Sequence, residues 1–247
     1  MATVTKYITF FDKNFGHPNA GRDGHFSYIE ECIAVAIKNN GKVFGGFVRD
    51  VIHPLSKGVE LKTLDFKDID IWFTTDSDAT SFVSEMGTRV IQNDITGLFD
   101  FKREGFYKFG RTHYHLYHNE VCIAWMDVVV SDEVPVDDFD VNTLCYNGGP
   151  FAEPLWYLGP TATSSEIIVL VNKMTDKKMT IKDSFVTRLV EDRKSVASVA
   201  QARLYKFLRQ GWKIVAIDPQ GEEVPITLSP PIIVVHEGKA KIVAAQN

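Results

Sequence analysis

The strongest constraint on the fold of this chain is a short apolar strand that breaks at two glycines and is followed by a second strand carrying two carboxylates. The first element lies in Val43–Asp50 and the second in Asp68–Phe73. Side chains two residues apart on a strand point to the same face, so Asp68 and Asp70 are expected to project together. A carboxylate pair of this kind suits one or two divalent cations, Mg²⁺ in particular.

The glycine pair predicts a second feature of the same site. Gly45 and Gly46 allow the backbone to turn sharply and to approach a ligand closely, and a helix that begins near Phe47 would direct its free N–H groups at a phosphate. Each motif alone also has an ordinary interpretation, the glycines as a turn and the carboxylates as a solvated strand edge. Together, in this order, they favour the transfer of a nucleotidyl or phosphoryl group, which depends on positioning and charge neutralisation.

These two motifs resemble the signature of the polymerase-β-type nucleotidyltransferases. The closest branch contains the CCA-adding tRNA nucleotidyltransferases and the bacterial poly(A) polymerases, whose pattern is G-G-x-V-R-D, a loop, and then D-x-D. Here Gly45–Asp50 reads G-G-F-V-R-D and Asp68–Asp70 reads D-I-D. The resemblance extends over about residues 25 to 146.

The family's fold requires a third carboxylate on a neighbouring strand, and Asp127 is the candidate. It is the only charged residue in the apolar run Val121–Val130. A carboxylate amid that much apolar surface is costly unless it binds a metal or another cation. The alternative is that Asp127 lies at an exposed end of the strand.

A further motif matches the family only in part. Asp138–Leu144 resembles the family's R-D-F-T-I-N-A-L, but Asp137 stands at the arginine position and Asp140 at the threonine position. Since the basic residue of that motif helps to handle the nucleotide or primer, its absence bears on the substrate. The link between the two catalytic motifs is also longer than usual, which predicts an inserted surface loop around Gly58.

Composition agrees with a globular protein that has a substantial core. The chain has 247 residues, 45% of them hydrophobic, which is enough for one large or two small domains. It contains neither an apolar run of about 18 residues nor an N-terminal signal pattern, so we expect no membrane association and a cytoplasmic protein. The three cysteines, Cys32, Cys122 and Cys145, are widely spaced in apolar surroundings and are expected to be core thiols.

The charge is unevenly distributed along the chain. The formal net charge is −5, which argues against a protein that grips long stretches of RNA. Residues 173 to 213, however, contain eleven basic and four acidic residues, a net charge of +7. This asymmetry is typical of a local nucleic-acid groove, and equally of an ordinary solvated helix face.

Periodicity predicts an α/β (α+β) protein with a small mixed sheet backed by helices and a helical C-terminal region. The expected domains are a catalytic domain over 1–147, a linker over 148–165 and a basic C-terminal region over 166–247 with a tail of short strands. A strand-like opening is expected at Val4–Phe11. The expected helices are His25–Asn40, a segment after Gly46, Asp78–Val90, Glu166–Lys173 and Ser184–Gln210. The expected strands are Lys42–Phe44, Ile69–Phe73, Phe106–His118, Val121–Val130, Ile214–Ile217 and Ile232–Val235.

Two other features are open to a functional interpretation. His113, His115 and His118 lie on the strand expected to pair with Val121–Val130, and a metal site there would need further ligands; a structural role is the alternative. The segment Arg203–Trp212 resembles a later nucleotide-contacting helix of the family. It also resembles a basic helix of uncharacterised viral nucleotidyltransferase-like proteins, which would imply the host cytoplasm as the location.

The resemblance implies a two-metal displacement that releases pyrophosphate from a nucleoside triphosphate. Asp68 and Asp70 would hold two Mg²⁺ ions, and Asp127 would ligate one of them and help to deprotonate the acceptor hydroxyl. Gly45 and Gly46 would seat the triphosphate. Arg49 would pair with phosphate and Asp50 with ribose, or the two would pair with each other at the start of the helix.

Three classes of function remain open at this point. The first is transfer of a nucleotide to an RNA 3′ end, favoured by the motif and the basic segment. The second is transfer to a hydroxyl of a protein or a small molecule. The third is a nucleotide-binding protein without turnover.

Overall fold

The computed structural model describes two compact units within residues 26 to 243. The described ranges are 26–64, 66, 68–93, 99–107, 111–118, 121–136, 138–186, 199–226, 232–236 and 239–243. The sheet unit comprises His17–Val136 and Val141–Asn172, and the C-terminal unit comprises Met1–Gly16, Asp137–Asp140 and Lys173–Asn247. The expected opening strand Val4–Phe11 lies outside the described residues.

The sheet unit is built on a seven-stranded mixed sheet with the order β3-β4-β5-β2-β1-β6-β7. Strands β2 and β5 pair in parallel, and the other neighbours pair antiparallel. A mixed sheet was the expected architecture. The strands are β1 Lys42–Phe44, β2 Asp68–Phe73, β3 Phe99–Tyr107, β4 Arg111–His118, β5 Val121–Val130, β6 Cys145–Tyr146 and β7 Trp156–Tyr157.

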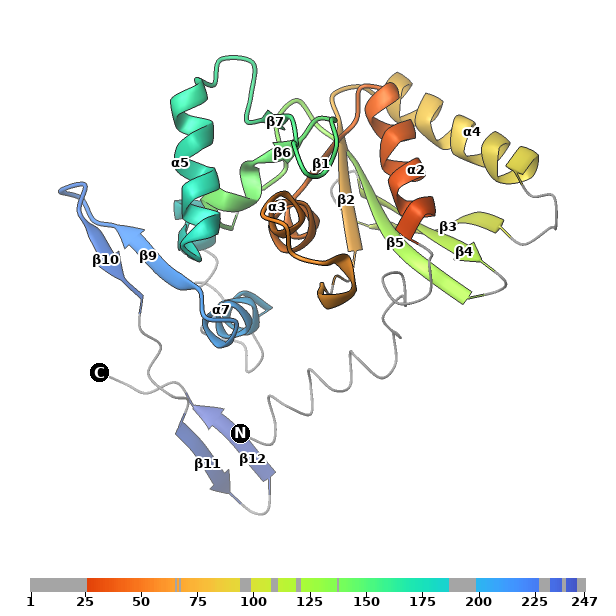
Figure 1. Cartoon of the computed structure of the whole chain (residues 1–247). Coiled ribbons are helices and arrows are strands. Elements are labelled where there is room, and N and C mark those ends of the chain that lie inside the picture. The colour runs from red at the N-terminus through yellow and green to blue at the C-terminus, as the bar shows by residue number, and fades with distance from the viewer. Residues whose placement is uncertain are drawn as a thin grey trace. The chain divides into compact units, whose positions relative to one another are not determined.

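Two helices cover one face of this sheet (Figure 1). They are α2 Phe26–Lys38 and α4 Asp76–Asn93, close to the ranges that apolar periodicity predicts. Their buried side chains, such as Ile33 and Phe82, form a single core cluster with Ile69, Ile71 and Met126 of the central strands. Since side chains alternate along a strand, the even-numbered neighbours Asp68 and Asp70 are left on the opposite face.

The chain enters a helical segment directly after the glycine turn, as expected. A π-helix, Val48–Ile52, continues into α3 His53–Ser56, and a 3-10 turn follows at Leu61–Thr63. The link between the two motifs therefore contains three short helical segments. Its tip around Gly58 is exposed.

The structure corrects one strand prediction. Phe106–His118 was expected to be a single strand, but Phe106 and Tyr107 end β3, and β4 begins at Arg111. The two strands pair antiparallel, with Tyr107 opposite Arg111. Gly110 is the only glycine or proline between Phe106 and His118, so local sequence signals gave little reason to divide the segment.

The region expected to be a linker, residues 148–165, contributes a strand to the sheet. Trp156 and Tyr157 form β7, which pairs with β6 at the sheet edge. The helix expected at Glu166–Lys173 is present as α5 Ser164–Thr175.

The C-terminal unit combines a helix with two small sheets. Phe139 is fully buried in it and packs against Phe185 and Phe207. Of the helix expected over Ser184–Gln210, the structure describes the final part as α7, and residues 187–198 lie outside the described ranges. The elements are the 3-10 turn η3 Asp140–Thr143, which leads back into the sheet unit, β8 Lys178–Thr180, α7 Val199–Arg209, β9 Lys213–Ile217, β10 Glu223–Pro225, β11 Ile232–His236 and β12 Lys239–Val243.

The expected strands at Ile214–Ile217 and Ile232–Val235 are present as β9 and β11. Within the described ranges, no helix has both the length and the apolar character required to cross a bilayer.

Candidate active site

Two of the three predicted carboxylates lie side by side on the central parallel strands. Asp70 of β2 is the register partner of Asp127 of β5. Neighbouring strands are about 4.8 Å apart, so the two side chains emerge next to each other on one face. Asp68 lies on the same face of β2, with Trp125 opposite it on β5. The fold thus brings Asp70 and Asp127 together and places Asp68 on the same face.

The carboxylate face is partly open. Asp70 and Asp127 are each 18% exposed, and Asp68 is also partly buried. Beyond them on the same face, Trp72 and Val129 enter a small apolar cluster with Phe44. Asp127 therefore lies at the point where the apolar part of this face ends, rather than at an exposed end of its strand.

The glycine turn lies directly against this carboxylate pair. Gly45 has a φ of +72°, in the left-handed region that favours glycine. A Cβ atom at this position would lie 2.9 Å from the Asp70 Oδ2 atom. Gly45 thus lets the backbone approach the carboxylate closely, whereas a Cβ at Gly46 would meet only an ordinary contact, 3.6 Å from Arg49 Nη2.

A chain of hydrogen bonds along β4 ends on Asp127. His113 is the register partner of Asp127, and its Nδ1 lies 2.5 Å from the Asp127 Oδ1 atom. Because an ionised carboxylate only accepts, His113 Nδ1 donates this bond. The Nε2 atoms of His113 and His115 are 2.9 Å apart, and the Tyr117 hydroxyl lies 3.1 Å from His115 Nδ1. In this arrangement each group donates toward Asp127 and orients its carboxylate.

His115 also stacks on Trp125, with ring centroids 5.6 Å apart and an interplanar angle of 22°. The two histidines that alternation placed on one face do share that face. Their described contacts are with Asp127, with each other and with aromatic neighbours.

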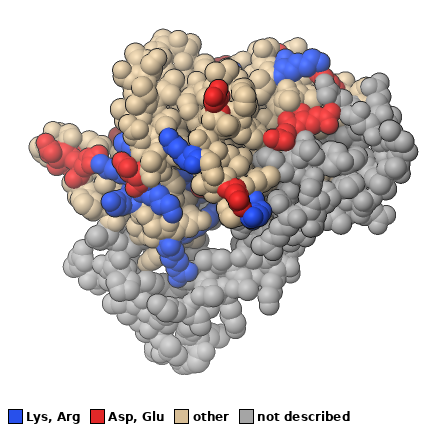
Figure 2. Space-filling model, viewed as in Figure 1, with Lys and Arg blue, Asp and Glu red and all other residues tan. Residues whose placement is uncertain are grey.

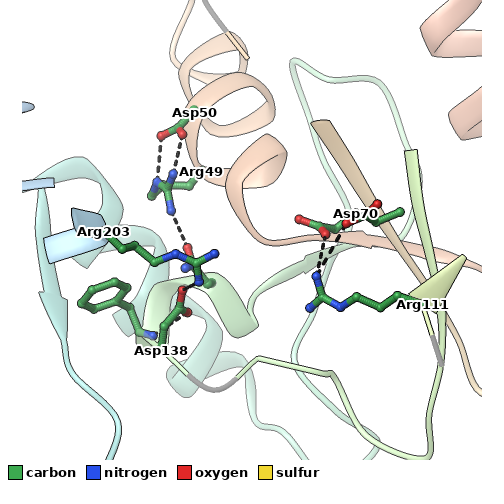
Figure 3. Close-up of polar contacts among 9 residues, drawn as sticks. Arg49, Asp50, Asp70, Arg111, Asp138 and Arg203 are labelled. Carbon is green, nitrogen blue, oxygen red and sulfur yellow. Dashed lines mark hydrogen bonds and ion pairs between the residues drawn. The ribbon is translucent and has the colours of Figure 1, made fainter. Parts of the chain in front are cut away.

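An arginine links the two adjacent carboxylates. Arg111 Nη1 lies 3.7 Å from Asp70 Oδ1 and 3.6 Å from Asp127 Oδ2. Figure 3 shows its side chain reaching from β4 to the Asp70 carboxylate. Arg111 is 36% exposed, so it bridges the carboxylates from the solvent side.

Arg49 and Asp50 form the pair that was the alternative to phosphate and ribose binding. Arg49 donates from Nε to Asp50 Oδ1 at 2.7 Å and from Nη2 to Asp50 Oδ2. Its Nη1 donates to Asn142 Oδ1 at 2.6 Å, and its side chain is only 3% exposed. Figure 3 shows this pair to one side of the Asp70–Arg111 contact.

Asn142 also forms a hydrogen bond with the backbone of the glycine turn. Its carbonyl accepts a hydrogen bond from the Gly45 N–H at 3.2 Å. The Arg49–Asn142 contact thereby connects the helical segment after the turn to η3.

The acidic residues of the second motif have structural partners in the C-terminal unit. Asp138 accepts a hydrogen bond from Arg203 at 2.6 Å, and Asp140 accepts from Lys173 at 2.6 Å and from the Thr180 N–H at 2.7 Å. The aspartate at the family's threonine position therefore serves as an anchor for β8. Asp137 lies outside the described residues.

Basic side chains gather in the C-terminal unit, with acidic ones among them (Figure 2). Lys206, Arg209 and Lys213 are exposed there. Lys178 pairs with Glu223, which neutralises part of the local positive charge. Arg188, Arg193 and Lys194 of the predicted basic segment lie outside the described residues.

The cysteines contribute no reactive group to this site. Cys32 and Cys145 are buried, and Cys122 is partly buried. Burial raises the pKa of the Cys145 thiol to about 12 and the pKa of the Cys32 thiol further still. Cys32 and Cys145 are core thiols, as expected, whereas Cys122 is only partly buried.

Sequence reasoning missed two contributors, Arg111 and Asn142. Both carry a signal in hindsight: Arg111 lies two residues before His113 on the same strand face, and Asn142 lies within the matched second motif. Their roles required the β4–β5 register and the return of η3 to the glycine turn.

No protein-family model, curated protein or solved structure matches this chain. Across the described ranges, no group of three or more His, Cys, Asp or Glu side chains is arranged so that it could hold a metal ion.

Proposed function

We propose that this protein is a Mg²⁺-dependent nucleotidyltransferase of the polymerase-β-like fold, which transfers NMP from an NTP to a hydroxyl acceptor and releases pyrophosphate. The observation that carries the proposal is the pairing of Asp70 with Asp127 on adjacent parallel strands, with Gly45 packed against Asp70. Asp68 adds a third carboxylate to the same face. The three carboxylates and the glycine turn therefore lie on one face of the central strands, which supports a cation and a phosphate binding side by side.

The donor set suits magnesium. Carboxylate oxygens are the hard ligands that Mg²⁺ prefers, and Arg111 is a cation already bound to both Asp70 and Asp127. Asp68, Asp70 and Asp127 would hold the metal, with one or two ions at the site. Bound magnesium supplies neutralisation of the triphosphate and of the charge that develops during transfer.

The remaining groups orient the reactants. The turn at Gly45 and Gly46 would bring backbone, rather than a side chain, next to the bound triphosphate. His113 holds the Asp127 carboxylate so that one oxygen remains directed at the acceptor hydroxyl. Arg49 stabilises the turn through its hydrogen bonds to Asp50 and Asn142.

The preferred acceptor is an RNA 3′ end. The support is the resemblance of Gly45–Asp50 and Asp68–Asp70 to the branch of CCA-adding tRNA nucleotidyltransferases and bacterial poly(A) polymerases, together with the exposed basic residues of the C-terminal unit. A hydroxyl on a protein or a small molecule is the competing acceptor.

The test is incubation of the purified protein with each labelled ribonucleoside triphosphate, Mg²⁺ and total RNA. The controls are Asp70→Asn and Asp127→Asn, which preserve shape and remove charge. We expect label on RNA with the intact protein, and a loss of at least about 1,000-fold in both variants because charge stabilisation is removed.

Two results would count against the proposal. Transfer at the normal rate by a folded Asp70→Asn variant would remove the carboxylates from the mechanism. Mg²⁺-dependent NTP binding with no label on RNA, protein or small-molecule acceptors would indicate a binding protein without turnover.

A further inference from the structure

The bridge made by Arg111 occupies the position at which the proposed function requires a divalent cation. Its guanidinium contacts Asp70 and Asp127 at 3.7 Å and 3.6 Å, and these two carboxylates are register partners. Two carboxylates side by side repel each other unless a cation lies between them. In this structure Arg111 is the cation that contacts both carboxylates.

We propose that Arg111 is a positioning residue that exchanges with the metal: it holds the carboxylates until the divalent cation binds, and is then released to contact the phosphates of the nucleotide. This inference rests on the proposed function of the same site. The sheet can keep the same structure before and after the metal binds, because only the long, partly exposed side chain of Arg111 has to move.

The burial pattern supports exchange rather than a permanent structural pair. Arg111 is 36% exposed, whereas Arg49, the buried arginine of the same unit, is 3% exposed and is held by Asp50 and Asn142 through close hydrogen bonds. The Arg111 contacts are longer than hydrogen bonds and can be broken at small cost. A guanidinium is also well suited to phosphate, since it presents a planar set of donors.

Lys42, another basic side chain on the described part of the carboxylate face, is directed elsewhere. Lys42 lies over the rings of Trp72 and Tyr157, with Nζ 5.2 Å and 4.7 Å from the centroids. His113 already donates to Asp127. Arg111 is therefore the side chain placed to respond when a metal neutralises the pair.

The experiment compares divalent cation binding by the intact protein and by Arg111→Gln in the absence of nucleotide. Mn²⁺ is the probe, with binding followed by electron paramagnetic resonance, and Mg²⁺ is titrated as its competitor. Removing two partly exposed ion pairs should tighten cation binding by roughly 3- to 30-fold. In the same variant, NTP binding in the presence of Mg²⁺ should weaken by about 10-fold or more, since the guanidinium that would bind a phosphate is absent.

Lys38→Gln is the matched control, because it removes an exposed ion pair with Glu85 in the same unit. It should change neither affinity. Thermal unfolding gives a second measurement: Arg111→Gln should be less stable than the intact protein without metal and should gain more in Tm from Mg²⁺.

The outcomes separate the two proposals. If cation binding is lost in Asp70→Asn but is the same in Arg111→Gln and the intact protein, the exchange is wrong and the proposed function stands. If no cation binds in a manner that depends on Asp70, both fail. Tighter cation binding with unchanged NTP affinity would overturn the phosphate contact.

Discussion

At the residue scale, the candidate site depends on how closely backbone and side chains approach each other. Gly45 allows the turn to lie against Asp70, and His113 and Arg111 each hold one side of the carboxylate pair. There is little room for a side-chain atom at Gly45, whereas a side-chain atom at Gly46 would make only ordinary contacts. Substitutions at the two glycines can therefore be compared directly.

Gly45→Ala should destabilise the protein and disable the site, whereas Gly46→Ala should leave the free energy of unfolding nearly unchanged. At Gly45 the added methyl meets both a positive φ and the Asp70 carboxylate, for a cost of about 1–3 kcal/mol. Urea unfolding and NTP transfer, measured on both variants, check this. Equal behaviour of the two variants would contradict the close approach of Gly45 to Asp70.

His53 gives the protein a pH-dependent stability. Burial, with a smaller contribution from Lys57, lowers the pKa of His53 to about 4, from 6.5 in the unfolded chain. The folded state therefore binds this proton less readily, so the stabilisation is complete above pH 6.5 and is lost as the pH falls toward 4. The loss should reach at most about 3 kcal/mol.

The measurement is the free energy of unfolding between pH 4 and pH 7, for the intact protein and His53→Leu. The variant should have a flatter profile in this window. Parallel profiles would show that another group carries the dependence.

At the element scale, the strands were more predictable than their pairing. Apolar runs identified β1, β2 and β5, and glycine punctuation identified the turn, because these signals are local. The division of Phe106–His118 between β3 and β4 was missed, since Gly110 is the only glycine or proline in that segment. The π-helix at Val48–Ile52 has no sequence signal of its own. Its first turn is held by the buried hydrogen bond from Arg49 to Asn142.

The contribution of the Arg49–Asn142 hydrogen bond can be tested by substitution of Asn142. Asn142→Ala removes the acceptor of Arg49 Nη1, a buried charged donor, while the backbone bond from Gly45 remains possible. We expect a loss of about 1–3 kcal/mol in the free energy of unfolding, together with lower transfer activity.

Asn39→Ala is the control, because it removes a half-buried asparagine that bonds to Glu85 on another element. Its loss should be smaller, and its transfer activity normal. If Asn142→Ala has normal transfer activity and a normal free energy of unfolding in chemical denaturation, the Arg49–Asn142 hydrogen bond is dispensable.

At the scale of the whole molecule, the chain passes repeatedly between two units. Phe139 is buried in the C-terminal unit, and Asn142, three residues later, binds Arg49 in the sheet unit. The partly matched second motif is therefore divided between the units. The basic residues, in contrast, are concentrated in the C-terminal unit.

If RNA is the acceptor, the exposed lysines of the C-terminal unit should contribute to its binding. Lys206→Gln with Lys213→Gln should weaken RNA binding, and should lower the slope of log affinity against log salt by up to about 0.7 for each phosphate that the protein no longer neutralises. Lys57→Gln with Lys62→Gln removes the same charge from the sheet unit and is the control. Fluorescence anisotropy across a salt series is the measurement, and equal slopes for the two variants would argue against an RNA surface in the C-terminal unit.

The sequence by itself determined which residues are candidates for the site and which elements hold them. Asp68 and Asp70 follow from strand alternation, Asp127 from its isolation in an apolar run, and Gly45 from its place between strand and helix. These are local properties, set by the periodicity of the backbone and by the cost of burying charge.

The tertiary structure decided which of these residues meet. The parallel register of β2 and β5 sets Asp70 beside Asp127, and the antiparallel register of β4 brings Arg111 and His113 to the same pair. The return of the chain at η3 gives Arg49 its partner Asn142. Register and chain return depend on contacts between segments far apart in sequence, and such contacts leave no periodic signal in any one of them.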